Sequence, residues 1–159
     1  MRIVASLSAY GWWKFVHLLG AFGFLAAHGA TAAVAMRLRT ERAPDRVRAL
    51  LDLSRSTRPW MYWSLLVLLV AGVVDGFLGH YWGAAWIWAA LILLLLLIVA
   101  AFPLAVPYYV RVRRAVAPGA EMEPDELDAL LRSSRPIVIA VVETLGIMVV
   151  VWLMVLKPF

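Results

Sequence analysis

Residues 12–36 read WWKFVHLLGAFGFLAAHGATAAVAM and decide the fold. At about 1.5 Å per residue, a helix of this length crosses the roughly 30 Å hydrocarbon core of a bilayer. The stretch contains two histidines, His17 and His28, which a helix places on one face about 16 Å apart along its axis. Ionisable side chains inside a membrane are costly and usually face the interior of a bundle. We therefore expect this histidine face to line the functional site.

The composition indicates a polytopic membrane protein. The chain is 64% hydrophobic, its mean hydropathy is +0.85, and its apolar residues fall into four long runs. We expect a single transmembrane domain over residues 1–159, in the all-α class, folded as an antiparallel four-helix transmembrane bundle in the lipid bilayer. The helices are predicted at about 12–36, 59–78, 82–110 and 135–157.

The arginines predict the orientation. Residues 37–58 and 111–135 contain seven and five basic residues, and only Arg2, Lys14 and Lys157 lie elsewhere. The positive-inside rule therefore predicts that loops 37–58 and 111–134 are cytoplasmic and that both termini lie outside. With this reading, the net charge of +5 indicates topology rather than a nucleic-acid partner. The richness in Arg, Ala and Pro suggests a GC-rich bacterial genome, and we expect a multi-pass protein of the bacterial cytoplasmic membrane.

Several kinds of chemistry are excluded by the sequence. The chain has no cysteine, so it forms no disulfide, iron–sulfur cluster or thiolate metal site. It also lacks a P-loop, a GxSxG or HExxH motif and a dinucleotide-binding fingerprint. We therefore do not expect a stand-alone enzyme.

Two short amphipathic segments precede predicted spans. Val47, Leu50, Leu51 and Ser54 form a narrow stripe within residues 45–57, which either lie on the membrane surface or extend the helix predicted at 59–78. A second short helix is expected to begin at Pro124.

His28 and Glu143 are predicted to lie at the same depth. His28 precedes Arg37 by nine residues, and Glu143 follows Arg135 by eight, so both lie roughly 12–13 Å from the arginine-rich side. Such a pair either orients a histidine that binds a metal or haem, or passes a proton, or joins two helices as a structural polar contact.

A second polar group is predicted near the opposite surface. His17 lies there with His80, which belongs to the short turn after the helix at 59–78, and Asp75 and Lys14 are at a similar level. His17 and His80 are candidate ligands of a metal or of haem b, with Asp75 and Lys14 in support. Alternatively, His80 is an ordinary interfacial residue and Asp75 pairs with Lys14. His17 and His28 are too far apart to bind one iron.

Two motifs carry a resemblance to a known family. KFVHLLGAFGFLAAHG (14–29) and GFLGHYWGAAWIW (76–88) resemble an uncharacterised bacterial family of four-helix integral membrane proteins. That family is distantly similar to CopD-type copper-resistance domains and HemJ-type protoporphyrinogen oxidases. In those proteins a helix-1 histidine is implicated in haem, and His17 is the matching position. HemJ-type enzymes also rely on a lysine in the third helix, which residues 82–110 lack, so the resemblance implies a fold and haem rather than that reaction.

Three functions follow as hypotheses. The first is a b-type haem protein for electron transfer or haem handling, using His17, His28 and His80 with Glu143 in support. The second is a proton-conducting or transporter module with His28 and Glu143 as the relay. The third is a non-catalytic subunit or anchor of a larger membrane complex. A homo-oligomer or membership of such a complex is expected.

Overall fold

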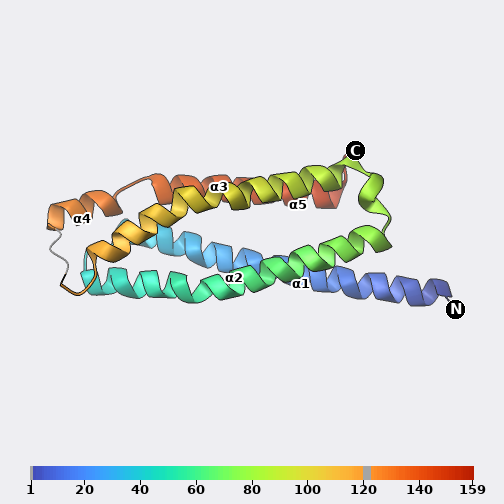
Figure 1. Ribbon diagram of the computed structural model, residues 1–159, viewed down its shortest axis with the longest axis horizontal. Helices are drawn as coiled ribbons and strands as arrows, with labels where there is room; N and C mark the ends of the chain where they lie inside the picture. The colour runs from blue at the N-terminus through green and yellow to red at the C-terminus, as the bar shows by residue number, and fades with distance from the viewer. Residues whose placement is uncertain (1, 120–122) are drawn as a thin grey trace.

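The protein is a bundle of long antiparallel helices (Figure 1). A computed structural model describes residues 2–119 and 123–159, and residues 120–122 of the predicted loop 111–134 lie outside the described residues. The elements are α1 (Arg2–Leu38), α2 (Pro44–Leu78), the 3₁₀ turn η1 (Tyr81–Gly83), α3 (Ala85–Ala115), α4 (Pro124–Leu131) and α5 (Arg135–Leu156).

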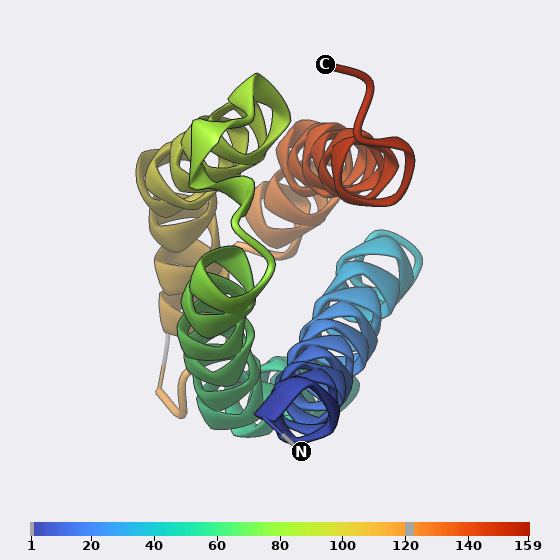
Figure 2. The ribbon, with the colours of Figure 1, turned by 90° about the vertical axis from the view of Figure 1, so that its right-hand side faces the viewer.

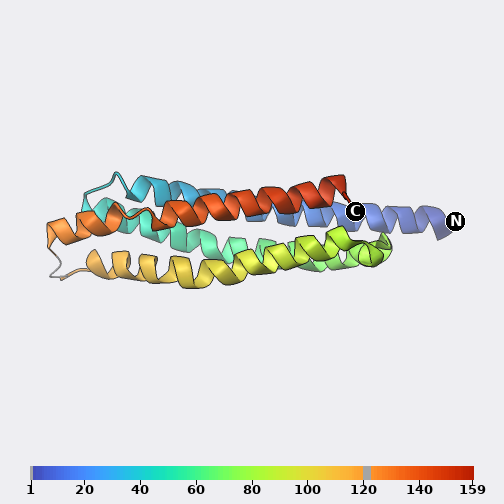
Figure 3. The same ribbon diagram turned by 90° about the horizontal axis from the view of Figure 1, so that it is seen from above.

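Four helical stretches of the described chain are long and apolar enough to span a membrane. They are Ala9–Leu38, Pro44–Leu78, Ala85–Ala115 and Asp125–Leu156, the last of which joins α4 to α5. The predicted all-α bundle with four spans is therefore confirmed. Figures 1 and 3 place both chain termini and the turn between α2 and α3 at one end of the bundle, and α4 at the other. We call the α4 end the arginine-rich end, because residues 37–58 and 111–135 at that end contain 12 of the 15 basic residues.

The helices form two tight pairs. Figure 2 shows α1 beside α2 and α3 beside α5, and contacts within these pairs far outweigh those between them. Gly20 and Gly23 of α1 lie directly against the turn of α2 that contains Ser64 and Leu68. Gly146 of α5 similarly accommodates the side chain of Leu97 on α3. Small residues let membrane helices approach closely, and here they decide which helices pair.

α2 is one continuous helix that begins 15 residues earlier than the span predicted at 59–78. Of the two readings of residues 45–57, extension of the helix is correct. Pro44 occupies the first turn, where its missing N–H costs nothing, and Val47, Leu51 and Ser54 are buried along one stripe. Pro59 is accommodated inside the helix. The loop predicted at 37–58 is therefore reduced to residues 39–43.

Of the other spans, α1 and α3 are longer than predicted, and α5 matches its predicted bounds. α1 begins at Arg2 rather than residue 12, and α3 continues to Ala115, through Pro103 and Pro107, rather than ending near 110. α5 and the short helix α4 agree with the sequence prediction.

The best-packed core lies at the arginine-rich end and not at the membrane centre. It joins the end of α1, the start of α2, the end of α3 and α4 through Val34, Leu38, Val47, Leu51, Tyr108, Val112, Val116 and Leu131. Polar contacts reinforce it: Arg113 of α3 pairs with Asp52 of α2 at 2.9 Å and donates to the Leu51 carbonyl, and Arg42 pairs with Asp128 of α4. This end therefore clamps both helix pairs together.

Candidate functional site

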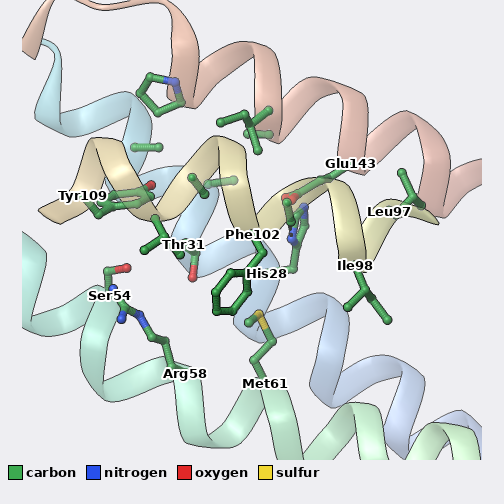
Figure 4. A pocket seen from close by; sticks show the side chains of 18 of the residues that line it. His28, Thr31, Ser54, Arg58, Met61, Leu97, Ile98, Phe102, Tyr109 and Glu143 are labelled. Carbon is green, nitrogen blue, oxygen red and sulfur yellow. Dashed lines mark ion pairs between the residues drawn. The ribbon is translucent and has the colours of Figure 1, made fainter. Parts of the chain in front are cut away.

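A cavity of about 610 Å³ separates the two helix pairs on the membrane side of this core. All four long helices contribute to it: His28 and Thr31 from α1, Ser54, Arg58 and Met61 from α2, Leu97, Ile98, Phe102 and Tyr109 from α3, and Glu143 from α5 (Figure 4). Its volume lies in the ~300–1,000 Å³ range of small-molecule sites. Its lining is mainly apolar, with a few polar groups at defined places.

His28 and Glu143 meet inside this cavity. Nδ1 of His28 lies 3.6 Å from Oε2 of Glu143, which is within ion-pair range and longer than a hydrogen bond. The side chains are 13% and 22% exposed. Phe24 stacks on the imidazole with ring centroids 6.2 Å apart. The structure therefore brings together the two residues that the sequence placed at equal depth.

The other ring nitrogen of His28 has no partner among the described residues. Nε2 is buried, and within the described part of the chain no hydrogen bond reaches it. A buried polar atom without a partner costs free energy, and such atoms in native proteins commonly indicate a functional role or a bound group. With a proton on Nδ1 facing the carboxylate, Nε2 carries a free lone pair, which is the arrangement of a histidine that binds a metal.

One end of the cavity is polar and cationic. Ser54, Arg55 and Arg58 of α2 line it together with Tyr109 of α3, and Figure 4 shows Arg58 and Ser54 side by side there. Phe102 and Val106 of α3 also line the cavity and are 68% and 42% exposed. Because α2 and α3 make few contacts with each other, the cavity is not closed between these two helices.

His17 serves the contact between α1 and α2. Its Nδ1 lies 2.9 Å from the Leu68 carbonyl oxygen, to which it donates when protonated there. The imidazole packs against Gly72, where a Cβ would come within 2.9 Å of the ring. This contact gives His17 a structural role that the sequence did not indicate.

His80 lies apart from His17 in the described structure. It is exposed, has a left-handed backbone with φ of 54° and begins the 3₁₀ turn η1. No hydrogen bond or ring contact between the two histidines occurs among the described residues, and no group of three or more His, Asp or Glu residues in the described chain is placed to hold a metal ion. That His17 and His80 bind one metal or haem stays a prediction, and no contact between the two side chains in the described structure supports it.

The two supporting residues also remain separate among the described contacts. Lys14 lies over the ring of Tyr10, 4.3 Å from its centroid. Asp75 keeps Oδ1 buried without a hydrogen-bond partner in the described chain. The ion pair between Asp75 and Lys14 that the sequence suggested is thus absent from the described residues.

Sequence reasoning missed the α2 side of the cavity. Arg55 and Arg58 were counted as loop residues and topology signals, Ser54 was placed only in the amphipathic stripe, and Met61 was given no role. The missed signal is helical spacing: residues 54, 58, 61 and 65 follow an i, i+4, i+7, i+11 pattern across Pro59 and share one face.

Comparison with known proteins identifies the family. The family model described as "Predicted integral membrane protein (DUF2269)" matches residues 12–158. The chain belongs to this family. The match reaches into all four spans and includes His28, Glu143 and every residue that lines the cavity. Neither the curated proteins nor the solved structures that were compared contain a match to this chain.

Proposed function

We propose that the protein binds haem b in the cavity between the two helix pairs, with Nε2 of His28 as the iron ligand. The observation that carries this proposal is the His28 ring, whose Nε2 is buried and unpartnered within the described chain while Nδ1 faces Glu143. A histidine that binds a metal usually presents its second nitrogen to a carboxylate, which fixes the ring orientation and raises the basicity of the ligand.

The remaining lining residues fit the same group. Phe24, Phe102 and Tyr109 provide aromatic surface for a flat ring, and Met61 offers a thioether, a known haem ligand, in the same cavity. Bound haem supplies one-electron transfer. The chain's own contribution is to orient His28 through Glu143, to exclude water with an apolar lining and to place the site within the membrane.

This proposal uses a different histidine from the pair first expected. His17 is occupied at the α1–α2 contact and His80 is exposed, which favours His28 as the principal ligand. We also propose that the protein resides in a bacterial cytoplasmic membrane with its arginine-rich end inside, following the positive-inside rule. Assembly into an oligomer or a larger complex stays a prediction.

The test is an absorption spectrum of the protein purified in phosphatidylcholine nanodiscs, before and after addition of haemin and dithionite. We expect a Soret band with sharp reduced α and β bands. His28→Ala should lose the low-spin spectrum, whereas His17→Ala and His80→Ala should keep it. A flat visible spectrum after haemin addition, or loss of the bands in His17→Ala with His28→Ala unaffected, contradicts the proposal.

The same pair supports a second candidate, proton transfer. His28 and Glu143 are titratable, lie 3.6 Å apart and face a cavity that reaches the arginine-rich end. In liposomes with an entrapped pH dye and no haem, the wild type should then conduct protons and Glu143→Gln should not. Glu41→Gln, which changes a carboxylate outside the cavity, is the matched control. Equal flux in all three proteins removes this candidate.

A further inference from the structure

The cavity has chemically different ends. Its cationic end contains Arg55 and Arg58, both projecting from α2 beside the buried Ser54. Its other end is formed by aliphatic side chains such as Leu97 and Ile98, with the His28–Glu143 pair between the two (Figure 4). A molecule that fills this space must therefore be apolar over most of its surface and polar at one edge.

Within the described residues, Arg55 and Arg58 have no acidic partner, in contrast to Arg48 and Arg113. Arg113 is held by Asp52 at 2.9 Å, and Arg48 by Asp45 at 2.7 Å. For Arg55 and Arg58, the described part of the chain provides neither an ion pair nor a side-chain hydrogen bond. Both arginines are exposed residues that line one end of a mainly apolar cavity. Because the described part of the chain supplies them no counterion, they favour an anionic group there, and the guanidinium shape suits a carboxylate.

We infer that Arg55 and Arg58 bind the acidic groups of the ligand, so that the cavity selects a flat apolar molecule with carboxylates along one edge and fixes which edge faces the arginine-rich end. This inference rests on the proposed function, for which the two propionates of haem are the acidic groups. Guanidinium and carboxylate match as bidentate hydrogen-bonding partners, and such charge-assisted bonds are roughly twice as strong as neutral ones. His28 then holds the flat ring of the ligand, and the arginines determine which edge of that ring faces the arginine-rich end.

The experiment compares haemin with haemin dimethyl ester, which has the same ring and iron but no free carboxylate. Both are titrated into phosphatidylcholine nanodiscs containing the wild type, the double variant Arg55→Gln/Arg58→Gln, or Arg111→Gln. Arg111 is the matched control, because it is exposed like Arg55 and Arg58 and lies at the same end of the bundle, but is outside this cavity. The Soret change gives the affinity in each case.

We expect the wild type to bind haemin at least tenfold more tightly than the ester, which corresponds to the loss of one charge-assisted hydrogen bond. The double variant should lose this preference, with haemin weakened about tenfold and the ester unchanged, while Arg111→Gln behaves as the wild type. Unchanged ester binding also shows that the double variant is folded.

Three results overturn the inference in distinguishable ways. Equal wild-type affinity for haemin and ester means that the arginines serve lipid headgroups only, and leaves the haem site intact. If the double variant binds both compounds equally more weakly than the wild type, the arginines stabilise the fold and do not bind the carboxylates. Failure of either compound to bind the wild type removes the proposed function, and the inference with it.

Discussion

Single glycines set the distance between α1 and α2. A Cβ added at Gly20 would lie 2.6 Å from the backbone nitrogen of Leu68 and 2.9 Å from its Cα. Backbone atoms cannot rotate away as a flexible side chain can, so the whole helix would have to shift. Gly29, nine residues further along the same helix, has nothing within 4 Å of the corresponding position.

These environments predict opposite effects of the same substitution. Gly20→Ala should destabilise the protein by about 1–3 kcal/mol through overpacking, which exceeds the gain of about 1 kcal/mol in helix propensity. Gly29→Ala should be neutral or slightly stabilising. Thermal unfolding of both variants in one detergent measures the difference, and a Gly20→Ala protein as stable as Gly29→Ala would refute the close approach.

At the same scale, the meeting of His28 and Glu143 could be predicted, and the contribution of Arg58 could not. Hydropathy and arginine positions fix depth along a membrane helix, and equal depth was sufficient to pair the first two residues. The helix face on which Arg58 lies could not be predicted, because Pro59 was taken as the start of a new helix. In the structure, α2 continues through Pro59 without a break.

The side chain of Glu41 holds the connection between α1 and α2. Oε1 of Glu41 accepts hydrogen bonds from the backbone N–H groups of Ala43 at 3.2 Å and Arg42 at 3.0 Å. These bonds, in that order of importance, lower the pKa of Glu41 below its ordinary value of 4.5. Only residues 39–43 join the helices, so the carboxylate stabilises the tight turn just before the positive end of α2.

The lowered pKa predicts a pH dependence with a definite sign. The folded protein binds the Glu41 proton less readily than the unfolded chain, so the stabilisation is complete above pH 4.5 and disappears as the pH falls through the lowered folded value. Thermal midpoints measured between about pH 3 and 6 should fall more steeply in the wild type than in Glu41→Gln. Parallel curves for the two proteins would exclude Glu41 as a source of acid sensitivity.

For the molecule as a whole, the four spans and their antiparallel order followed from hydropathy alone. The cavity did not, because its existence depends on how far apart the two helix pairs stand. That separation arises from glycine faces that draw α1 to α2 and α5 to α3, and from the clamp at the arginine-rich end. Neither the choice of pairs nor the clamp is encoded in local periodicity.

Orientation is a prediction for the whole molecule, and the absence of cysteine makes it testable with single added thiols. Gly83 lies at the end shared by the termini, and Asp125 lies in α4 at the arginine-rich end; both are exposed. In intact bacterial cells, a membrane-impermeant maleimide should label Gly83→Cys and spare Asp125→Cys until the cells are lysed. The reverse pattern would place the arginine-rich end outside.

The opening between α2 and α3 beside Phe102 and Val106 has a consequence for what competes with the ligand. These exposed side chains line the cavity where α2 and α3 make few contacts. The interior is therefore open to acyl chains on this side, and an arriving molecule displaces lipid rather than water. Hydrocarbon is as apolar as the lining, and an apolar ring gains little by moving from one to the other. Discrimination then depends on the few polar contacts inside, and a compound lacking them would partition into the surrounding bilayer instead.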